Sequence, residues 1–81
     1  MNITVYSTKT CGYCVMLKKF LDDKGVNYTN YSVDVNPIAA QYMISLSGQM
    51  SVPFSTIEHD DGKMDKILGF DRAKFEAILS C

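Results

Sequence analysis

The 81-residue sequence lacks an excess of either charge, a long hydrophobic run and more than a few cysteines. Eight basic and nine acidic residues leave a formal net charge of −1. Such a chain has no strong field to hold a nucleic acid or an anionic lipid surface. Residues 1–6 turn polar at Ser7, far short of the apolar core of a signal peptide, and no apolar run approaches membrane-spanning length. These absences predict a cytoplasmic protein that binds neither nucleic acid nor membrane.

The cysteines are too few to form the multi-bridge framework of a small secreted domain. Cys11 and Cys14 lie close together, and Cys81 is the last residue. In a reducing compartment such a close pair is either redox-active or half of a metal site. A zinc site needs four ligands, and only His59 and Cys81 remain, neither in a recognisable spacing. No metal is therefore expected; His59 is interpreted as a solvated turn residue and Cys81 as an exposed thiol prone to intermolecular bridging.

The length and composition predict one globular domain over residues 1–81. Hydrophobic residues make up 47% of the chain and charged residues 21%, which is ordinary for a folded domain and leaves no linker or repeat. The domain is expected to act as a monomer. Most methionines are interpreted as gap-filling core or rim residues rather than as a binding surface, namely Met16, Met43, Met50 and Met64.

Hydrophobic patterning divides the chain into the order β-α-β-α-β-β-α. Apolar residues recur at helical spacing in three segments, and β-branched or aromatic residues concentrate in four others. The strands are predicted at residues 3–6, 28–35, 52–58 and 64–68, and the helices at 14–25, 36–48 and from Asp71 onward. A helix-linked strand pair followed by a hairpin predicts an α/β fold, with a four-stranded mixed sheet flanked by three helices.

The pair Cys11 and Cys14 falls where the first strand ends and the first helix begins. Free backbone N–H groups and the positive end of the helix dipole stabilise a thiolate at that place, so Cys11 is the predicted nucleophile. Cys14 shares the core-facing side of the helix with Leu17 and Leu21, and it is the predicted resolving cysteine. The alternative is a pair of unreactive cysteines, but a strand-motif-helix context favours redox chemistry.

Three short motifs stand at the ends of predicted elements: Cys11-Gly12-Tyr13-Cys14, Ser51-Val52-Pro53 and Gly69-Phe70-Asp71. Together they resemble the glutaredoxin family, and the resemblance covers the whole chain. It implies the minimal thioredoxin fold, in agreement with the predicted order of elements. It also implies a thiol-disulfide oxidoreductase that reduces protein disulfides, glutathione mixed disulfides or both.

The resemblance also implies roles for Val52 and Pro53. In that family the matching proline is cis and lies against the active-site cysteines, and the backbone of the residue before it pairs with the bound thiol substrate. The alternative is that Pro53 only starts a strand, where its missing N–H does no harm.

Glutathione is the co-substrate that the resemblance implies, with no bound cofactor. The family binds it through a basic residue before the cysteines, the motif tyrosine, the Val-Pro backbone and a Gly-Gly-x-Asp-Asp stretch. Leu68 and Arg72 replace two members of that stretch, and each remaining residue also has an ordinary structural explanation, as a loop charge, an exposed aromatic or a helix cap. The predicted binding residues are Lys9, Tyr13, Val52, Pro53, Gly69, Phe70 and Asp71.

Two further alternatives follow from the same resemblance. Gly69-Phe70 is similar to redoxins that are recharged by thioredoxin reductase and donate electrons to ribonucleotide reductase. Gly12, where many relatives have proline, is similar to glutaredoxins that carry an iron-sulfur cluster between two subunits. A third alternative, an inert interaction module, would reduce no disulfide at all.

Overall fold

The computed structural model describes residues 1–79, and its elements follow the predicted order β-α-β-α-β-β-α. The strands are β1 (Asn2–Ser7), β2 (Thr29–Ser32), β3 (Phe54–Glu58) and β4 (Met64–Leu68). The helices are α1 (Gly12–Asp23), α2 (Pro37–Ser47) and α3 (Arg72–Leu79). The prediction of a minimal thioredoxin fold is confirmed. Cys81, predicted to be an exposed thiol, lies outside the described residues.

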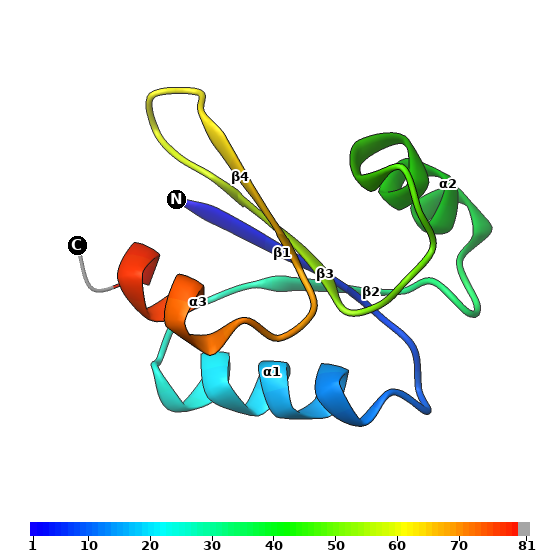
Figure 1. Cartoon of the computed structure of the whole chain (residues 1–81), viewed down its shortest axis with the longest axis horizontal. Helices are drawn as coiled ribbons and strands as arrows, with labels where there is room; N and C mark the ends of the chain where they lie inside the picture. Colours follow the sequence, from blue (N-terminus) through cyan, green and yellow to red (C-terminus); the bar gives the residue numbers. More distant parts are fainter. Residues whose placement is uncertain (80–81) are drawn as a thin grey trace.

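The four strands form one sheet in the order β2-β1-β3-β4. β1 runs parallel to β2 and antiparallel to β3, and β4 returns antiparallel beside β3. The helices α1 and α3 lie on one side of this sheet and α2 lies on the other (Figure 1). β1 lies inside the sheet, and from its end at Ser7 the chain passes directly into the loop that carries the cysteines.

The larger part of the core lies between the sheet and the helices α1 and α3. It is built from alternate residues of the strands, which share one face of a pleated sheet, and from the apolar sides of the two helices. Its buried members are Ile3, Val5, Leu17, Phe20, Leu21, Ile57, Ile67 and Phe75. Ile78 and Leu79 pack against this cluster from α3, as the predicted apolar stripe requires.

A smaller core lies under α2. Its buried members are Tyr6, Ala39, Met43 and Phe54. Asn36 caps the helix, because its side-chain oxygen accepts a hydrogen bond of 3.1 Å from the Ala39 N–H. Gly48 ends the helix with a φ of 74°, in the left-handed region that glycine adopts without steric cost. Both ends of this helix are where the sequence predicts them.

Three local predictions are wrong. The second strand ends at Ser32 instead of residue 35, because the Val35 N–H bonds the Ser32 carbonyl at 3.2 Å and closes a turn. The third strand begins at Phe54, since Pro53 has no N–H for the ladder. Tyr42, expected on the apolar side of α2, is 55% exposed, because it lines a surface pocket with Tyr6 and Tyr31 of the sheet instead of packing into the core.

Among the residues that the structure describes, no helix combines the length and the apolar character needed to cross a bilayer.

Candidate active site

Cys11 and Cys14 are joined by a disulfide at the start of α1. Their Cα atoms lie 5.2 Å apart, within the range that a disulfide spans without backbone movement. Cys11 is the N-cap residue of α1, and its Sγ accepts a hydrogen bond of 3.1 Å from the Cys14 N–H. The motif therefore places one sulfur directly at the free N–H groups of a helix, as predicted.

The two sulfurs differ in their access to solvent. Cys14 is completely buried beneath α1, on the side that also carries Leu17 and Leu21. Cys11 is partly exposed. An incoming disulfide can therefore reach Cys11, whereas Cys14 can reach only the sulfur already bonded to it. This asymmetry is the one on which the predicted roles of nucleophile and resolving cysteine depend.

The loop before β3 lies against the cysteine pair. The Val52 carbonyl oxygen is 3.9 Å from the Cys11 Sγ, and the Val52–Pro53 peptide bond is cis, as expected. Pro53 is buried, whereas Val52 is partly exposed. The backbone of Val52 is thus the part of this loop that a molecule bonded to Cys11 would meet first.

The segment from Gly69 to Asp71 adjoins the same loop. The Gly69 N–H donates a hydrogen bond of 2.8 Å to the Pro53 carbonyl, which joins the end of β4 to the start of β3. Asp71 caps α3, and its Oδ1 accepts from the Lys74 N–H at 3.2 Å. Phe70 turns the other way and packs on Phe20, with ring centroids 5.5 Å apart. Asp71 therefore has the capping role, which leaves its second oxygen available.

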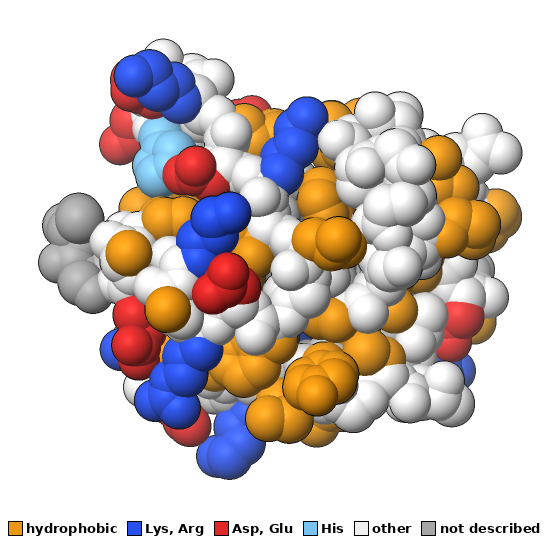
Figure 2. Space-filling view, in the orientation of Figure 1, with side chains coloured by type: hydrophobic (Ala, Val, Ile, Leu, Met, Phe, Trp, Pro, Cys, Tyr) orange, Lys and Arg blue, Asp and Glu red, His pale blue; other side chains and the backbone are white. Residues whose placement is uncertain are grey.

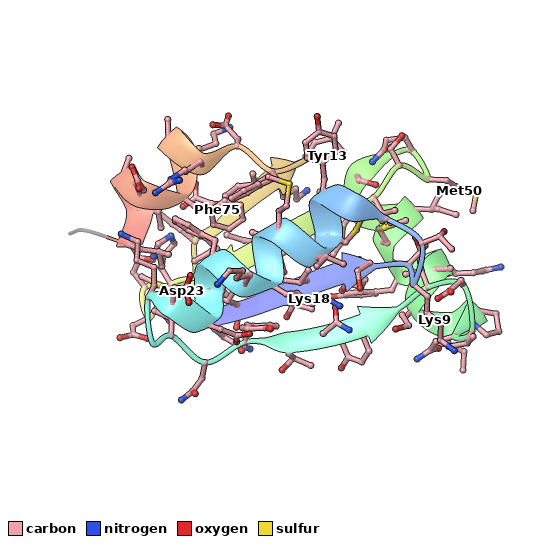
Figure 3. All side chains as sticks on the ribbon, turned by 90° about the horizontal axis from the view of Figure 1, so that it is seen from below. Lys9, Tyr13, Lys18, Asp23, Met50 and Phe75 are labelled. Atoms are coloured by element: carbon pink, nitrogen blue, oxygen red, sulfur yellow. A yellow bond between two sulfur atoms is a disulfide. The ribbon has the colours of Figure 1, made fainter. Side chains whose placement is uncertain are left out.

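Tyr13 and Lys9 point to different sides of the start of α1 (Figure 3). Tyr13 is 66% exposed. The backbone N–H of Lys9 lies 3.4 Å from the Asp34 carboxylate, which adds a negative charge beside the lysine. The structure therefore places Tyr13 and Val52 at the cysteines and joins Gly69 to the same loop through Pro53. The Phe70 ring packs on Phe20 instead, and Lys9 lies on the opposite flank of the loop.

Other titratable groups have shifted pKa values. Burial, followed by the neighbouring Tyr42 and Tyr31, raises the pKa of Tyr6. Burial, followed by Asp22, raises the pKa of Tyr28. A hydrogen bond from the N-terminal ammonium lowers the pKa of Asp60. None of these three groups belongs to the predicted site, so their shifts report packing and local pairing.

His59 lies at the hairpin and pairs with Asp65, with the His59 Nε2 and Asp65 Oδ2 2.6 Å apart. Its side chain is 29% exposed, so this hairpin residue is partly solvated while it pairs with the neighbouring strand. Within residues 1–79, no three His, Cys, Asp or Glu side chains gather closely enough to bind a metal ion.

One exposed residue near the cysteines was not predicted as part of a binding surface. Met16 follows Tyr13 by one turn of α1 and is 52% exposed. Its place three residues after the motif tyrosine is a signal in the sequence, because residues three apart share a helix side. Met43, by contrast, is buried in the core, as predicted for a gap-filling methionine.

Comparison with known proteins matches residues 3–57 to the sequence model of the glutaredoxin family. Glutaredoxin 3 of Escherichia coli K12 is 35% identical over 63 residues, which cover 75% of this chain and 76% of that protein. An uncharacterized glutaredoxin-like 8.6 kDa protein of the rubredoxin operon of Clostridium pasteurianum is 32% identical and covers 95% of this chain and 96% of its own length.

Solved structures share the fold. The buckwheat glutaredoxin in its glutathione complex is 27% identical with a TM-score of 0.70, covering 96% of this chain and 69% of that one. The glutaredoxin-like NrdH-redoxin of Escherichia coli, described as having a thioredoxin-like activity profile, is 24% identical with a TM-score of 0.78. It covers 96% of this chain and 95% of its own, and at that identity the likeness concerns the fold alone.

Proposed function

This chain belongs to the glutaredoxin family, and from that membership we propose that it reduces protein disulfides and glutathione mixed disulfides through Cys11 and Cys14. Thiol-disulfide oxidoreduction is the general activity of the family. The observation that carries the proposal is the asymmetry of the pair: a partly exposed sulfur at the N-terminus of α1 and a fully buried sulfur behind it.

The first step forms a mixed disulfide. The Cys11 thiolate attacks one sulfur of the substrate, the substrate S–S bond breaks, and the departing sulfur leaves as a thiolate that takes a proton from water. Backbone N–H groups at the helix start, including that of Cys14 at 3.1 Å, stabilise the Cys11 thiolate before attack. The Val52 carbonyl, 3.9 Å from the Cys11 Sγ, borders the space into which the substrate enters.

The second step releases a protein substrate. Cys14 gives up its proton and attacks the Cys11 sulfur, and the second substrate sulfur leaves as a thiol. The substrate gains two electrons and two protons, and the protein ends as the Cys11–Cys14 disulfide, which is the state described here. Two glutathione thiols restore the dithiol by the reverse exchange, and they leave as glutathione disulfide.

A pair of serine variants tests these roles. Cys11→Ser should abolish activity on every disulfide, since the attacking sulfur is gone, while serine remains a good N-cap for α1. Cys14→Ser should retain reduction of a glutathione mixed disulfide, because a second glutathione can attack the Cys11 adduct. The measurement is turnover with glutathione and its reductase, and equal loss in both variants would contradict the assignment.

A second candidate uses thioredoxin reductase as the electron source and ribonucleotide reductase as a recipient. One end of the predicted glutathione site departs from the family pattern, because Arg72 stands where an aspartate is usual, and at the other end the Asp34 carboxylate lies beside Lys9. Arg72 is also engaged with Glu76 at 3.2 Å. These departures weaken the recognition of a tripeptide that carries two carboxylates and an ammonium, and they favour a reductant that is itself a protein.

The two reductants are separated by one experiment. The oxidised protein is incubated with glutathione plus glutathione reductase, or with thioredoxin reductase, each with NADPH, and the thiols that appear are counted. Recovery with glutathione supports the first candidate. Recovery only with thioredoxin reductase contradicts the first candidate and supports the second.

A further inference from the structure

A cleft of about 410 Å³ lies between α1 and the start of α3. Figure 1 draws these two helices on the same side of the sheet, and Figure 2 shows Lys and Arg side chains beside hydrophobic ones over the region where they meet. The lining residues are Met16, Lys19, Phe20, Asp23, Lys24, Phe70 and Arg72. Of these residues, only Phe70 belongs to the predicted glutathione site.

The floor of the cleft is aromatic. Phe20 is 8% exposed and lies 5.5 Å from the Phe70 ring, centroid to centroid. Lys24 and Arg72 each place their charge over the Phe20 ring, at 5.4 and 5.5 Å from its centroid. The rings hold both cations at the rim by cation–π attraction. The cleft therefore offers an apolar floor with fixed positive charges above it.

The charges that line the cleft are unbalanced. Three are cationic, on Lys19, Lys24 and Arg72, and one is anionic, on Asp23. Glu76 adds a second anion beside the cleft, where it pairs with Arg72 at 3.2 Å, so one net positive charge remains. Lys19 pairs with Asp23 at 3.4 Å, but the two side chains are 75% and 68% exposed. Exposed pairs of this kind contribute about 1 kcal/mol at most, so a carboxylate from a partner can replace one at little cost.

The cleft begins about one helical turn beyond the cysteine motif. Met16 at its near end follows Tyr13 by one helical turn, and Phe70 immediately precedes Asp71. From Cys11 to Lys19 and Lys24 the helix rises about 12 to 20 Å, which an extended peptide spans in roughly four to six residues. A segment bonded to Cys11 can therefore reach the cations without leaving the surface.

We propose that this cleft docks an acidic, partly apolar segment of the disulfide-bearing substrate protein, with a carboxylate about four to six residues from the reacting cysteine. An apolar side chain of the segment lies on Met16, Phe20 and Phe70, and its carboxylate meets Lys19 and Lys24. The inference rests on the proposed oxidoreductase function, since it names the class of substrate that the cysteines serve. Attraction between these lysines and a carboxylate of the substrate makes acidic substrate proteins associate faster than neutral or basic ones.

The test compares two peptides that each carry one cysteine in a mixed disulfide with the same small thiol. They are identical except that the residues about four positions to either side of the cysteine are Glu in one and Lys in the other. The reduced protein, in a single turnover, should release the small thiol from the acidic peptide with a second-order rate constant about five- to tenfold higher than from the basic one. Raising the ionic strength to about 0.5 M should reduce this preference.

Charge-reversal variants test whether Lys19 and Lys24 cause the preference for the acidic peptide. The double variant Lys19→Glu, Lys24→Glu should lose it or reverse it. The matched control Lys63→Glu, Lys66→Glu makes the same change of charge on exposed residues of the hairpin and should keep it. Bis(2-hydroxyethyl) disulfide, which is small and uncharged, should be reduced equally by all three proteins and reports the chemistry of the cysteines alone.

Each outcome decides the proposal. Equal rates with both peptides, or equal effects of the two double variants, overturn the cleft as a docking site while reduction of the small disulfide leaves the oxidoreductase function standing. Failure to reduce even the small disulfide overturns the proposed function and the docking site with it. A protein dimer that the Lys19→Glu, Lys24→Glu variant dissociates would make a second copy the occupant instead.

Discussion

The two sides of the sheet differ in charge and in burial. On one side, α1 and the turn after it carry charged residues of both signs around the larger core. On the other side lies α2, within a segment of residues 35–57 that has no charged residue and also includes all of β3 except its last residue, Glu58. In Figure 2 the side chains over α2 are hydrophobic or uncharged. The cysteine pair lies between these two surfaces.

The comparison shows that a more apolar helix is not a more buried one. α1 buries Cys14, Leu17, Phe20 and Leu21, whereas α2 buries only Ala39 and Met43. Ile38 of α2 is 82% exposed. The charged residues of α1 cannot enter the core, so only one side of this helix can pack against the sheet. α2 has no such restriction, and the small area of sheet beneath it decides what it buries.

The largest expected effect is on the α1 side. Leu17→Ala should lower the free energy of unfolding by about 3 to 5 kcal/mol, because Leu17 is fully buried in the larger core and its neighbours cannot close the cavity. Urea denaturation of the oxidised protein measures it. A loss below about 1.5 kcal/mol would mean that this core is loosely packed.

The matching change on the α2 side should be smaller. Met43→Ala should lower the free energy of unfolding by about 2 to 3 kcal/mol, since Met43 is fully buried but its cluster is small and bordered by partly exposed side chains that can relax. Measured beside Leu17→Ala in the same buffer, an equal or larger loss would remove the difference between the two sides.

Capping of α2 should contribute less again. Asn36→Ala should cost about 1 kcal/mol, because the Ala39 N–H loses the oxygen that accepts its hydrogen bond. Asn36→Asp restores an acceptor at the same atom and should recover most of the loss. If the aspartate variant is as unstable as the alanine variant, the cap is not the cause.

The smallest effect should come from the exposed surface of α2. Ile38→Ser should change the free energy of unfolding by less than about 0.5 kcal/mol, since the side chain is 82% exposed. Thermal and urea midpoints measure the change at several protein concentrations. A concentration-dependent loss above about 1 kcal/mol would show that this surface is covered by another molecule in solution.

Most of the fold could be predicted from the sequence where two local signals agree. In α1 the charges and the apolar positions alternate at helical spacing, and in α2 a cap, a first-turn proline and Gly48 mark both ends. The prediction of burial failed where packing between segments distant in the sequence decides the outcome. Tyr42 has a helical place among apolar residues, but it lines a surface pocket between α2 and the sheet instead of joining the core.

The candidate site divides in the same way. Cys11 and Cys14 could be placed from their position between a strand and a helix. Val52 could be placed only through the family resemblance, because 41 residues separate it from Cys11 in the chain. The cleft between α1 and α3 was missed, since it exists only where Phe20 of one helix meets Phe70 before another.

The long separation of Cys11 and Val52 has a consequence for biosynthesis. The chain emerges from the ribosome N-terminus first, so both thiols of the motif are available before Val52 and its neighbours have been made. β1 likewise cannot pair with β3, its antiparallel partner, until β3 has been synthesised. Until then the nascent segment can exchange disulfides as a simple dithiol peptide does. Discrimination among substrates begins only when the later half of the chain has folded onto it.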